Sequence, residues 1–190
     1  HPDYPAIKVF ILYLTKPEGP MWRQIRGLGL SYRYRIYVQP ESGLLYFQLA
    51  KSTHIVKAFK VARDIVMGYV KGEINFSEIT LESDKSSLTF EVIEKEKTVS
   101  ESSKECLLSY YRGVSHTYNR DLLQKISKVS IADLQRVAEK YMAPLFDVSQ
   151  IRCAVCCHPS KVEEITEEFR KLSIELKILK SLEEDFLCRL

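Results

Sequence analysis

The chain has 190 residues, of which 45% are hydrophobic and 11% aromatic, a composition typical of a folded protein and not of a disordered chain. Its formal net charge of +3 is too small to indicate nucleic acid or an anionic membrane as a partner. The longest apolar stretch, residues 9–14, is far shorter than the roughly 20 residues that span a bilayer. We therefore expect one globular domain over residues 1–190, with no membrane partner and no signal peptide. Because no initiator Met opens the chain, we expect it to be a fragment of a longer parent.

The first part of the chain predicts two helices, a hairpin and a long third helix. Apolar residues recur at helical spacing from Ile7 to Leu14, and residues 21–25 predict a short second helix. Residues 32–39 alternate between drier and wetter positions, residues 40–43 form a turn, and residues 44–51 return. A continuous apolar stripe then predicts a helix from residue 55 to about residue 71.

The second part predicts several helices and two further strands. Helices are expected over residues 77–95, 100–111 and 121–128, and Ser130 with Asp133 forms a capping box that starts a helix through Tyr141. Strands are expected at residues 151–157 and 174–179, with a helix at residues 159–172 between them. Strands that are separated by helices but share one sheet indicate an α+β fold. We therefore expect a two-layer sandwich, a mainly antiparallel sheet with helices on one face.

The segment Gly19-Pro-Met-Trp-Arg-Gln-Ile-Arg-Gly-Leu-Gly-Leu-Ser-Tyr32 is the most informative stretch of the sequence. Arg26 and Tyr32 bracket two glycines, and a chain reversal there would hold a guanidinium and a phenol close together and facing outward. Both groups can donate hydrogen bonds to the carbonyl oxygens of an extended peptide. On pattern alone, an exposed arginine at a helix end and an ordinary strand tyrosine are the simpler interpretation. Trp22, Tyr34 and Tyr37 are better explained by packing.

This segment resembles the C-terminal domains of pitrilysin/insulinase-type zinc metallopeptidases, especially the presequence-protease-like branch. The resemblance extends along nearly the whole chain, through Glu18-Gly-Pro-Met-Trp-Arg-Gln-Ile-Arg-Gly, Glu41-Ser-Gly-Leu-Leu-Tyr-Phe and Val129-Ser-Ile-Ala-Asp-Leu-Gln-Arg-Val. It implies that Arg26 and Tyr32 bind substrate. It also implies a domain that usually begins with strands upstream of the first helix, so we expect the first strands to be absent here and a strand edge to be open.

The catalytic residues of that family are absent from this sequence. The family uses an inverted zinc motif, His-x-x-Glu-His, and no histidine here has another four residues away. We therefore expect no catalytic residue and no metal ligand in this chain. The resemblance implies zinc in the parent enzyme, bound by an N-terminal domain, with a peptide substrate and the N-terminal half of the same parent as partners. The alternatives are a non-catalytic structural relative of the processing-peptidase or core-subunit type, and a free-standing nucleic-acid module, which the small net charge disfavours.

The cysteines do not indicate a disulfide scaffold. Their number, five, is odd, which favours reduced thiols in a cytoplasmic or mitochondrial-matrix compartment. The run from Cys153 through Cys156 and Cys157 to His158 has no second cysteine pair to complete a zinc site. We interpret these cysteines as small buried residues of a strand.

Overall fold

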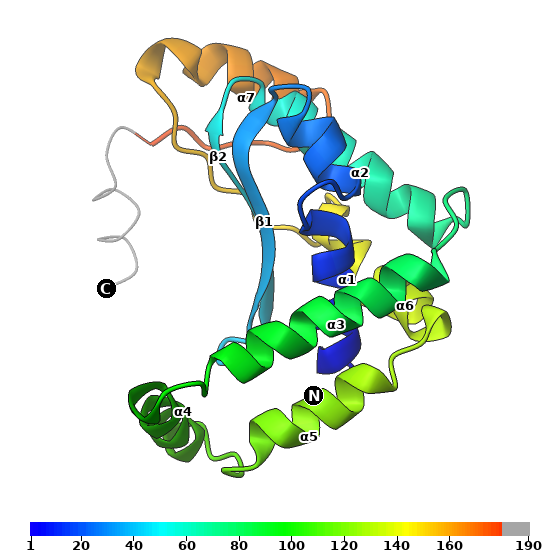
Figure 1. Cartoon of the computed structure of the whole chain (residues 1–190). Coiled ribbons are helices and arrows are strands. Elements are labelled where there is room, and N and C mark those ends of the chain that lie inside the picture. Colours follow the sequence, from blue (N-terminus) through cyan, green and yellow to red (C-terminus); the bar gives the residue numbers. More distant parts are fainter. Residues whose placement is uncertain (180–190) are drawn as a thin grey trace.

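The computed structural model describes residues 1–179 and has an α+β architecture, with a β-hairpin packed against a layer of helices (Figure 1). In chain order the elements are α1 (Tyr4–Thr15), η1 (Trp22–Arg26), β1 (Ser31–Gln39), β2 (Leu44–Ser52), α2 (Ile55–Val70), α3 (Glu78–Glu94), α4 (Val99–Tyr111), α5 (Tyr118–Ser127), α6 (Ile131–Val137), η2 (Ala138–Met142), η3 (Pro144–Phe146), η4 (Pro159–Lys161) and α7 (Val162–Arg170). The predicted α+β class, the helices and the hairpin are confirmed.

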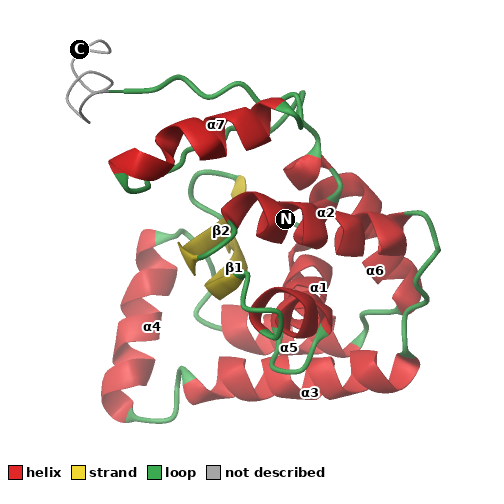
Figure 2. Cartoon of the chain, turned by 90° about the horizontal axis from the view of Figure 1, so that it is seen from above, coloured by secondary structure: helices red, strands yellow, loops and turns green. Residues whose placement is uncertain are grey.

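Helix α1 is the centre of the core. Pro5 lies in its first turn, where a missing N–H costs no helical hydrogen bond, and Val9, Phe10 and Leu14 are fully buried. Figure 2 shows α1 almost end-on, with the hairpin on one side and α2, α3, α5 and α6 around it. Helix α1 thus contacts α2, α3, α5, α6 and β1, whereas α7 packs on α2.

The hairpin has one buried and one open face. Strands β1 and β2 are antiparallel, with Tyr34 opposite Leu49 and Ile36 opposite Phe47 on the face that joins the core. Alternate residues point the other way, so Arg35 lies opposite Gln48 on the exposed face. The predicted alternation is therefore observed from Arg33 onward, with the wetter face turned away from α1, but it is wrong for Tyr32, which is 60% exposed.

Two predicted strands are wrong. Residues 151–157 and 174–179 run as extended chain, and neither pairs with β1, β2 or the other segment among the described residues. Their apolar residues still point inward, because Ile151, Val155 and Leu176 pack around Phe169 of α7. An alternating sequence pattern indicates that one side of a segment is buried. A β-strand also requires a second strand whose backbone pairs with its N–H and C=O groups. Between residues 1 and 179 the sheet therefore consists of β1 and β2.

An aromatic cluster joins α1 to α2 and to the start of α3. The rings of Phe10, Tyr13, Tyr69 and Phe76 lie 4.7–6.4 Å apart between centroids, mostly edge to face. The Tyr13 hydroxyl accepts a hydrogen bond of 3.0 Å from the backbone N–H of Ser77, the residue that caps α3. Burial raises the pKa of Tyr69. The cluster therefore sets both where α3 begins and how it meets α1.

One ion pair between α1 and α3 is buried. Lys16 Nζ lies 2.5 Å from Asp84 Oδ1, and the Asp84 residue is fully inaccessible to solvent. Burial raises the pKa of Asp84, and the ion pair with Lys16 opposes that rise. Among the described residues, Asp84 Oδ2 has no hydrogen-bond partner. Lys16 is thus the group that makes the buried carboxylate tolerable.

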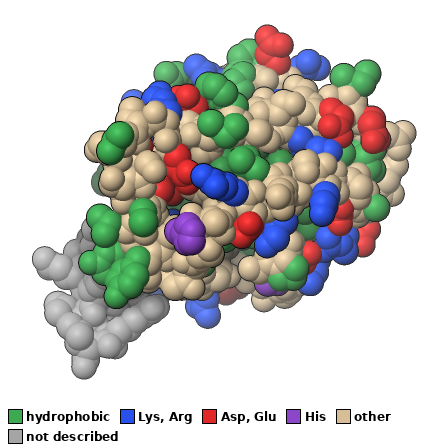
Figure 3. Space-filling model, turned by 60° about the horizontal axis from the view of Figure 1, so that its bottom comes forward, with side chains coloured by type: hydrophobic (Ala, Val, Ile, Leu, Met, Phe, Trp, Pro, Cys, Tyr) green, Lys and Arg blue, Asp and Glu red, His purple; other side chains and the backbone are tan. Residues whose placement is uncertain are grey.

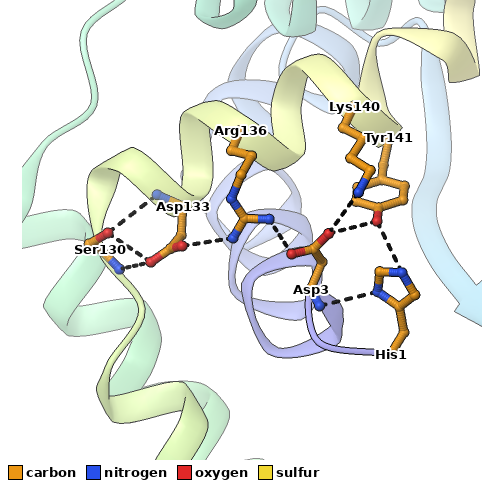
Figure 4. Close-up of polar contacts among 7 residues, drawn as sticks. All are labelled: His1, Asp3, Ser130, Asp133, Arg136, Lys140 and Tyr141. Atoms are coloured by element: carbon orange, nitrogen blue, oxygen red, sulfur yellow. Dashed lines mark hydrogen bonds and ion pairs between the residues drawn. The ribbon is translucent and has the colours of Figure 1, made fainter.

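The start of the chain is tied to the far end of the helical layer by a polar network (Figure 4). Asp3 accepts hydrogen bonds from the side chains of Arg136, Lys140 and Tyr141, and the Tyr141 hydroxyl lies 2.7 Å from Asp3 Oδ2. The hydrogen bond from Tyr141, reinforced by those from Arg136 and Lys140, outweighs the opposing effect of burial. It lowers the pKa of Asp3 to about 2. Arg136 also pairs with Asp133 of the confirmed capping box.

Helix α4 differs from the other helices because none of its residues is buried. It lies at the corner of the molecule opposite α2 and α7 (Figure 1). Val99, Leu107, Tyr110 and Tyr111 of α4 are each at least 60% exposed. Figure 3 shows apolar side chains in small groups between charged ones on the lower face of the molecule. No helix within residues 1–179 is long and apolar enough to span a bilayer.

Candidate functional site

The candidate site begins with a wide turn of helix, η1, that ends at Arg26. The backbone N–H of Gly27 donates to the carbonyl oxygen of Trp22, five residues earlier, at 2.9 Å, which makes this a π-helical turn. A Cβ on Gly27 would lie 2.4 Å from the carbonyl oxygen of Arg23. No larger residue therefore fits at position 27 unless the backbone moves. Gly27 is therefore required because the turn leaves no space for a side chain at this position.

The second glycine supplies a backbone conformation. Gly29 has a φ of 66°, in the left-handed region, and its N–H donates to the carbonyl oxygen of Arg26 at 3.0 Å. The N–H of Leu30 donates to the carbonyl oxygen of Ile25 at 2.9 Å. These two hydrogen bonds form a Schellman motif, which ends a helix and reverses the chain. The predicted reversal is therefore built from Gly27 and Gly29 acting in different ways.

The reversal brings Arg26 and Tyr32 together. The Arg26 guanidinium carbon lies 5.0 Å from the centroid of the Tyr32 ring, a cation–π contact, and Tyr32 is 60% exposed. The two residues predicted from the sequence thus form one surface cluster, facing outward. Both Arg26 and Tyr32 are exposed to solvent.

The structure adds Lys51, which the sequence did not indicate. Lys51 Nζ lies 5.8 Å from the centroid of the same Tyr32 ring. Lys51 lies across the hairpin from Tyr32, between the pairs Ser31–Ser52 and Arg33–Ala50. Its φ of 54° is unusual for a residue with a side chain and marks local backbone strain. The strand register was the only available signal, since residue 51 faces residue 32 once the turn is placed at residues 40–43. We call Arg26, Tyr32 and Lys51 the cationic cluster.

The base of the hairpin holds the cationic cluster firmly. The carbonyl oxygen of Leu30 accepts hydrogen bonds from the N–H groups of both Thr53 and His54, at 3.0 and 3.1 Å. The Ser31 hydroxyl, which is almost fully buried, lies 2.9 Å from the Arg33 carbonyl oxygen and 2.8 Å from the Ser52 hydroxyl. The residues next to Tyr32 and Lys51 are therefore fixed by the core, while Tyr32 and Lys51 themselves face solvent.

The neighbouring aromatic residues Tyr34 and Tyr37 have packing roles, as predicted, but Trp22 does not anchor the core. The Tyr34 hydroxyl donates to the carbonyl oxygen of Thr15 at 3.3 Å, and burial raises the pKa of Tyr34 to about 12. Tyr37 stacks on Tyr46 with ring centroids 5.0 Å apart. Trp22 is only partly buried, and its neighbours Met21 and Ile25 are fully buried instead. Because η1 is a single short turn, only Met21 and Ile25 point into the core, and Trp22 lies beside it at the surface.

The cationic cluster lies on an open surface. One cavity, of about 640 Å³, is lined by residues of α2, η2 and η3, and a second, of about 260 Å³, lies between α1, α5 and the hairpin tip. Neither includes a residue of the cluster. An exposed cluster without a cavity suits an extended ligand better than a small molecule, which needs a concave site.

The resemblance assigns zinc to an N-terminal domain, and the described residues of this chain form no metal site of their own. Within residues 1–179 no three His, Cys, Asp or Glu side chains gather closely enough to hold a metal ion. Cys153 and Cys156 are exposed and Cys157 is half-buried, so the prediction of small buried residues is wrong for the first two. The segment lies at the edge of the fold without a strand neighbour, and its alternate side chains therefore meet solvent.

Comparison with known proteins finds relatives and folds, but no protein-family model matches the chain. The chain is 33% identical over 162 residues to an uncharacterised protein of Caenorhabditis elegans, covering 85% of this chain and 16% of that protein. It is 29% identical to an uncharacterised protein of Saccharomyces cerevisiae, covering 97% of this chain and 18% of that protein. The chain thus spans less than a fifth of the length of these relatives.

Two crystal structures share the fold. One is of a protein assigned as a zinc protease in Bordetella pertussis, with a TM-score of 0.62 at 15% identity, covering 79% of this chain and 82% of that one. The other is the peptidase domain, described as inactive, of a protein assigned as a zinc protease in Bordetella parapertussis. Its TM-score is 0.63 at 14% identity, covering 84% of this chain and 87% of that one. The chain therefore has the fold of a zinc-protease peptidase domain.

Proposed function

We propose that this chain is the non-catalytic, peptide-holding domain of a longer zinc metalloendopeptidase. The observation that carries the proposal is the exposed contact between Arg26 and Tyr32, 5.0 Å apart, at a reversal held by the core. The fold supports it, because a domain described as an inactive peptidase domain has the same architecture. In this proposal the parent belongs to the presequence-protease-like branch, and its N-terminal domain carries the zinc motif. The present domain closes over that N-terminal domain, and the two together enclose the substrate chamber.

In the proposed role the two side chains act as donors. The Arg26 guanidinium and the Tyr32 hydroxyl donate to carbonyl oxygens of a peptide that crosses the surface in extended form. Zinc, bound elsewhere in the parent, would polarise the scissile carbonyl and activate water. This chain positions the peptide. On its own it is expected to bind peptide without cleaving it and without retaining zinc.

The test is steady-state kinetics on the longer chain with single substitutions. Arg26→Ala removes a charged donor, worth roughly 1.5–3 kcal/mol, and is expected to lower kcat/KM by about 10- to 100-fold. Tyr32→Phe removes a neutral donor and is expected to cost about 2- to 10-fold. If a substitution raises KM and leaves kcat unchanged, the side chain binds the substrate equally strongly in the ground state and in the transition state.

Two exposed residues of the same types serve as controls. Arg120→Ala in α5 and Tyr110→Phe in α4 change residues that lie outside the cationic cluster. They are expected to leave kcat/KM unchanged. If all four variants keep the wild-type rate constants and melting temperature, the proposal is wrong.

A further inference from the structure

The segment of the chain that contains the cationic cluster is strongly basic. Between residues 19 and 62 the sequence has seven Lys or Arg residues and one Asp or Glu. The rest of the chain has more acidic than basic residues. The small net charge of the whole chain therefore conceals a strongly basic segment, and that segment contains η1, the hairpin and the first half of α2.

The basic residues of this segment have no carboxylate neighbours in the part of the chain that the structure describes. The ion pairs within residues 1–179 involve none of Arg23, Arg26, Arg33 or Lys51. The single acidic residue of the segment, Glu41, lies at the hairpin tip and pairs with Arg112. Elsewhere the basic side chains of the helices commonly meet a carboxylate. Within residues 1–179 the positive charge of these side chains is thus not offset by ion pairs.

Within the cluster, two cations approach one ring. Arg26 and Lys51 both lie within 6 Å of the Tyr32 centroid, so the cluster places two positive charges beside one exposed ring. The core imposes this arrangement, since Lys51 is in a strained backbone conformation and Ser31 is locked beside it. A carboxylate of a bound peptide could pair with either cation, because neither pairs with a carboxylate within residues 1–179.

We propose that the cluster selects acidic peptides, with Lys51 and Arg26 contacting Asp or Glu side chains of an extended segment. This inference rests on the proposed function and names its substrate class. A nucleic acid fits less well, because single strands are held by stacking successive bases on several aromatic side chains, whereas the cluster contains one aromatic ring, Tyr32, which two cations approach. The Tyr32 hydroxyl remains available for a backbone carbonyl.

The experiment measures binding of labelled ten-residue peptides to the 190-residue chain by fluorescence anisotropy. One peptide carries three Glu residues, a second has Gln at those positions, and a third has Lys. Each surface ion pair contributes modestly, so we expect the Glu peptide to bind about 10-fold more tightly than the Gln peptide at low salt, with the ratio falling as salt is added. Amidating the C-terminus of each peptide removes its terminal carboxylate and leaves only the side-chain carboxylates. We expect this change to leave the Glu-over-Gln affinity ratio unchanged.

Variants assign the preference to the cluster. Lys51→Gln and Arg26→Gln are each expected to reduce the Glu-over-Gln ratio by about 3-fold. Lys104→Gln on α4, also an exposed lysine, is the matched control and is expected to leave the ratio unchanged. Circular dichroism of each variant checks the fold.

The possible failures are distinct. If no peptide binds, the proposed function itself fails. If the Glu and Gln peptides bind equally, or if Lys104→Gln lowers the ratio as much as Lys51→Gln, peptide holding stands and the acidic selectivity is overturned. A single-stranded oligonucleotide of ten nucleotides that binds more tightly than the Glu peptide at equal salt would also overturn it.

Discussion

Gly29 is the residue on which the shape of the candidate site most depends. Its φ of 66° ends the π-helical turn and sends the chain into β1, and no atom blocks a side chain there. The obstacle to substitution is conformational and not steric. Gly27 presents the opposite case. Its backbone conformation is an ordinary helical one, but a side chain there would collide with the carbonyl oxygen of Arg23.

Gly29→Ala is expected to lower the free energy of unfolding by about 1–2 kcal/mol, because a side chain disfavours the left-handed region. Gly29→Asn is the matched comparison and is expected to cost less, since asparagine tolerates that region better. Urea denaturation of the three proteins measures the difference. Equal midpoints for the alanine and asparagine variants would contradict this account.

Asp3 gives the molecule a pH dependence of known sign. Its pKa in the folded protein, about 2, is below the value near 3.9 expected for an unfolded chain. The stabilisation is therefore complete above about pH 4 and is lost as the pH falls toward 2. Asp3→Asn keeps the shape of the side chain but not its charge.

We expect Asp3→Asn to cost about 1–3 kcal/mol near pH 7 and progressively less as the pH falls from 4 to 2, where wild type and variant converge. Melting curves at several pH values measure this. Asp64→Asn changes an exposed carboxylate of α2 and is the control. A difference between Asp3→Asn and wild type that stays constant down to pH 2 would show that the charge of Asp3 is not the cause.

At the level of elements, helices of similar length differ in what stabilises them. α1 is buried on most sides, whereas α4 has no buried residue and is joined to the hairpin tip by the exposed pair of Arg112 and Glu41. A helix of this length is marginal in water without tertiary packing. Thr98 caps α4 through the N–H of Glu101, which is a local contribution only.

Backbone amides of α4 are therefore expected to exchange with solvent at least about 100-fold faster than those of α1. Hydrogen–deuterium exchange with peptide-level resolution distinguishes the two helices. The comparison is internal, so it needs no variant. Similar protection of the two helices would indicate that α4 is covered, for example by a second copy of the chain.

The elements that were predicted correctly are those whose signals are local. Helix caps such as Ser130 with Asp133, the apolar stripe of α2 and the turn at residues 40–43 act within a few residues. The strands predicted at residues 151–157 and 174–179 failed because pairing depends on a partner distant in sequence. The contact between Arg26 and Tyr32 was predictable because the two glycines between them indicate a chain reversal. Lys51 was not, because its place depends on register and on a strained φ that no residue type indicates.

For the whole molecule, the shared acceptor at Leu30 has a thermodynamic consequence. Leu30 is almost fully buried, and its carbonyl joins the start of β1 to the start of α2 immediately beside Tyr32. The hydrogen bonds that join β1 to α2 thus also fix the backbone beside the cationic cluster, so ligand binding is coupled to the folding of these two elements. A ligand that binds only the folded cluster stabilises the domain against global unfolding by about 2.7 kcal/mol at a hundredfold excess over its Kd, whereas local opening of α4 leaves the cluster intact and is unaffected. Occupancy of a shallow, exposed site would then protect even the distant aromatic cluster of α1 and α2 against unfolding.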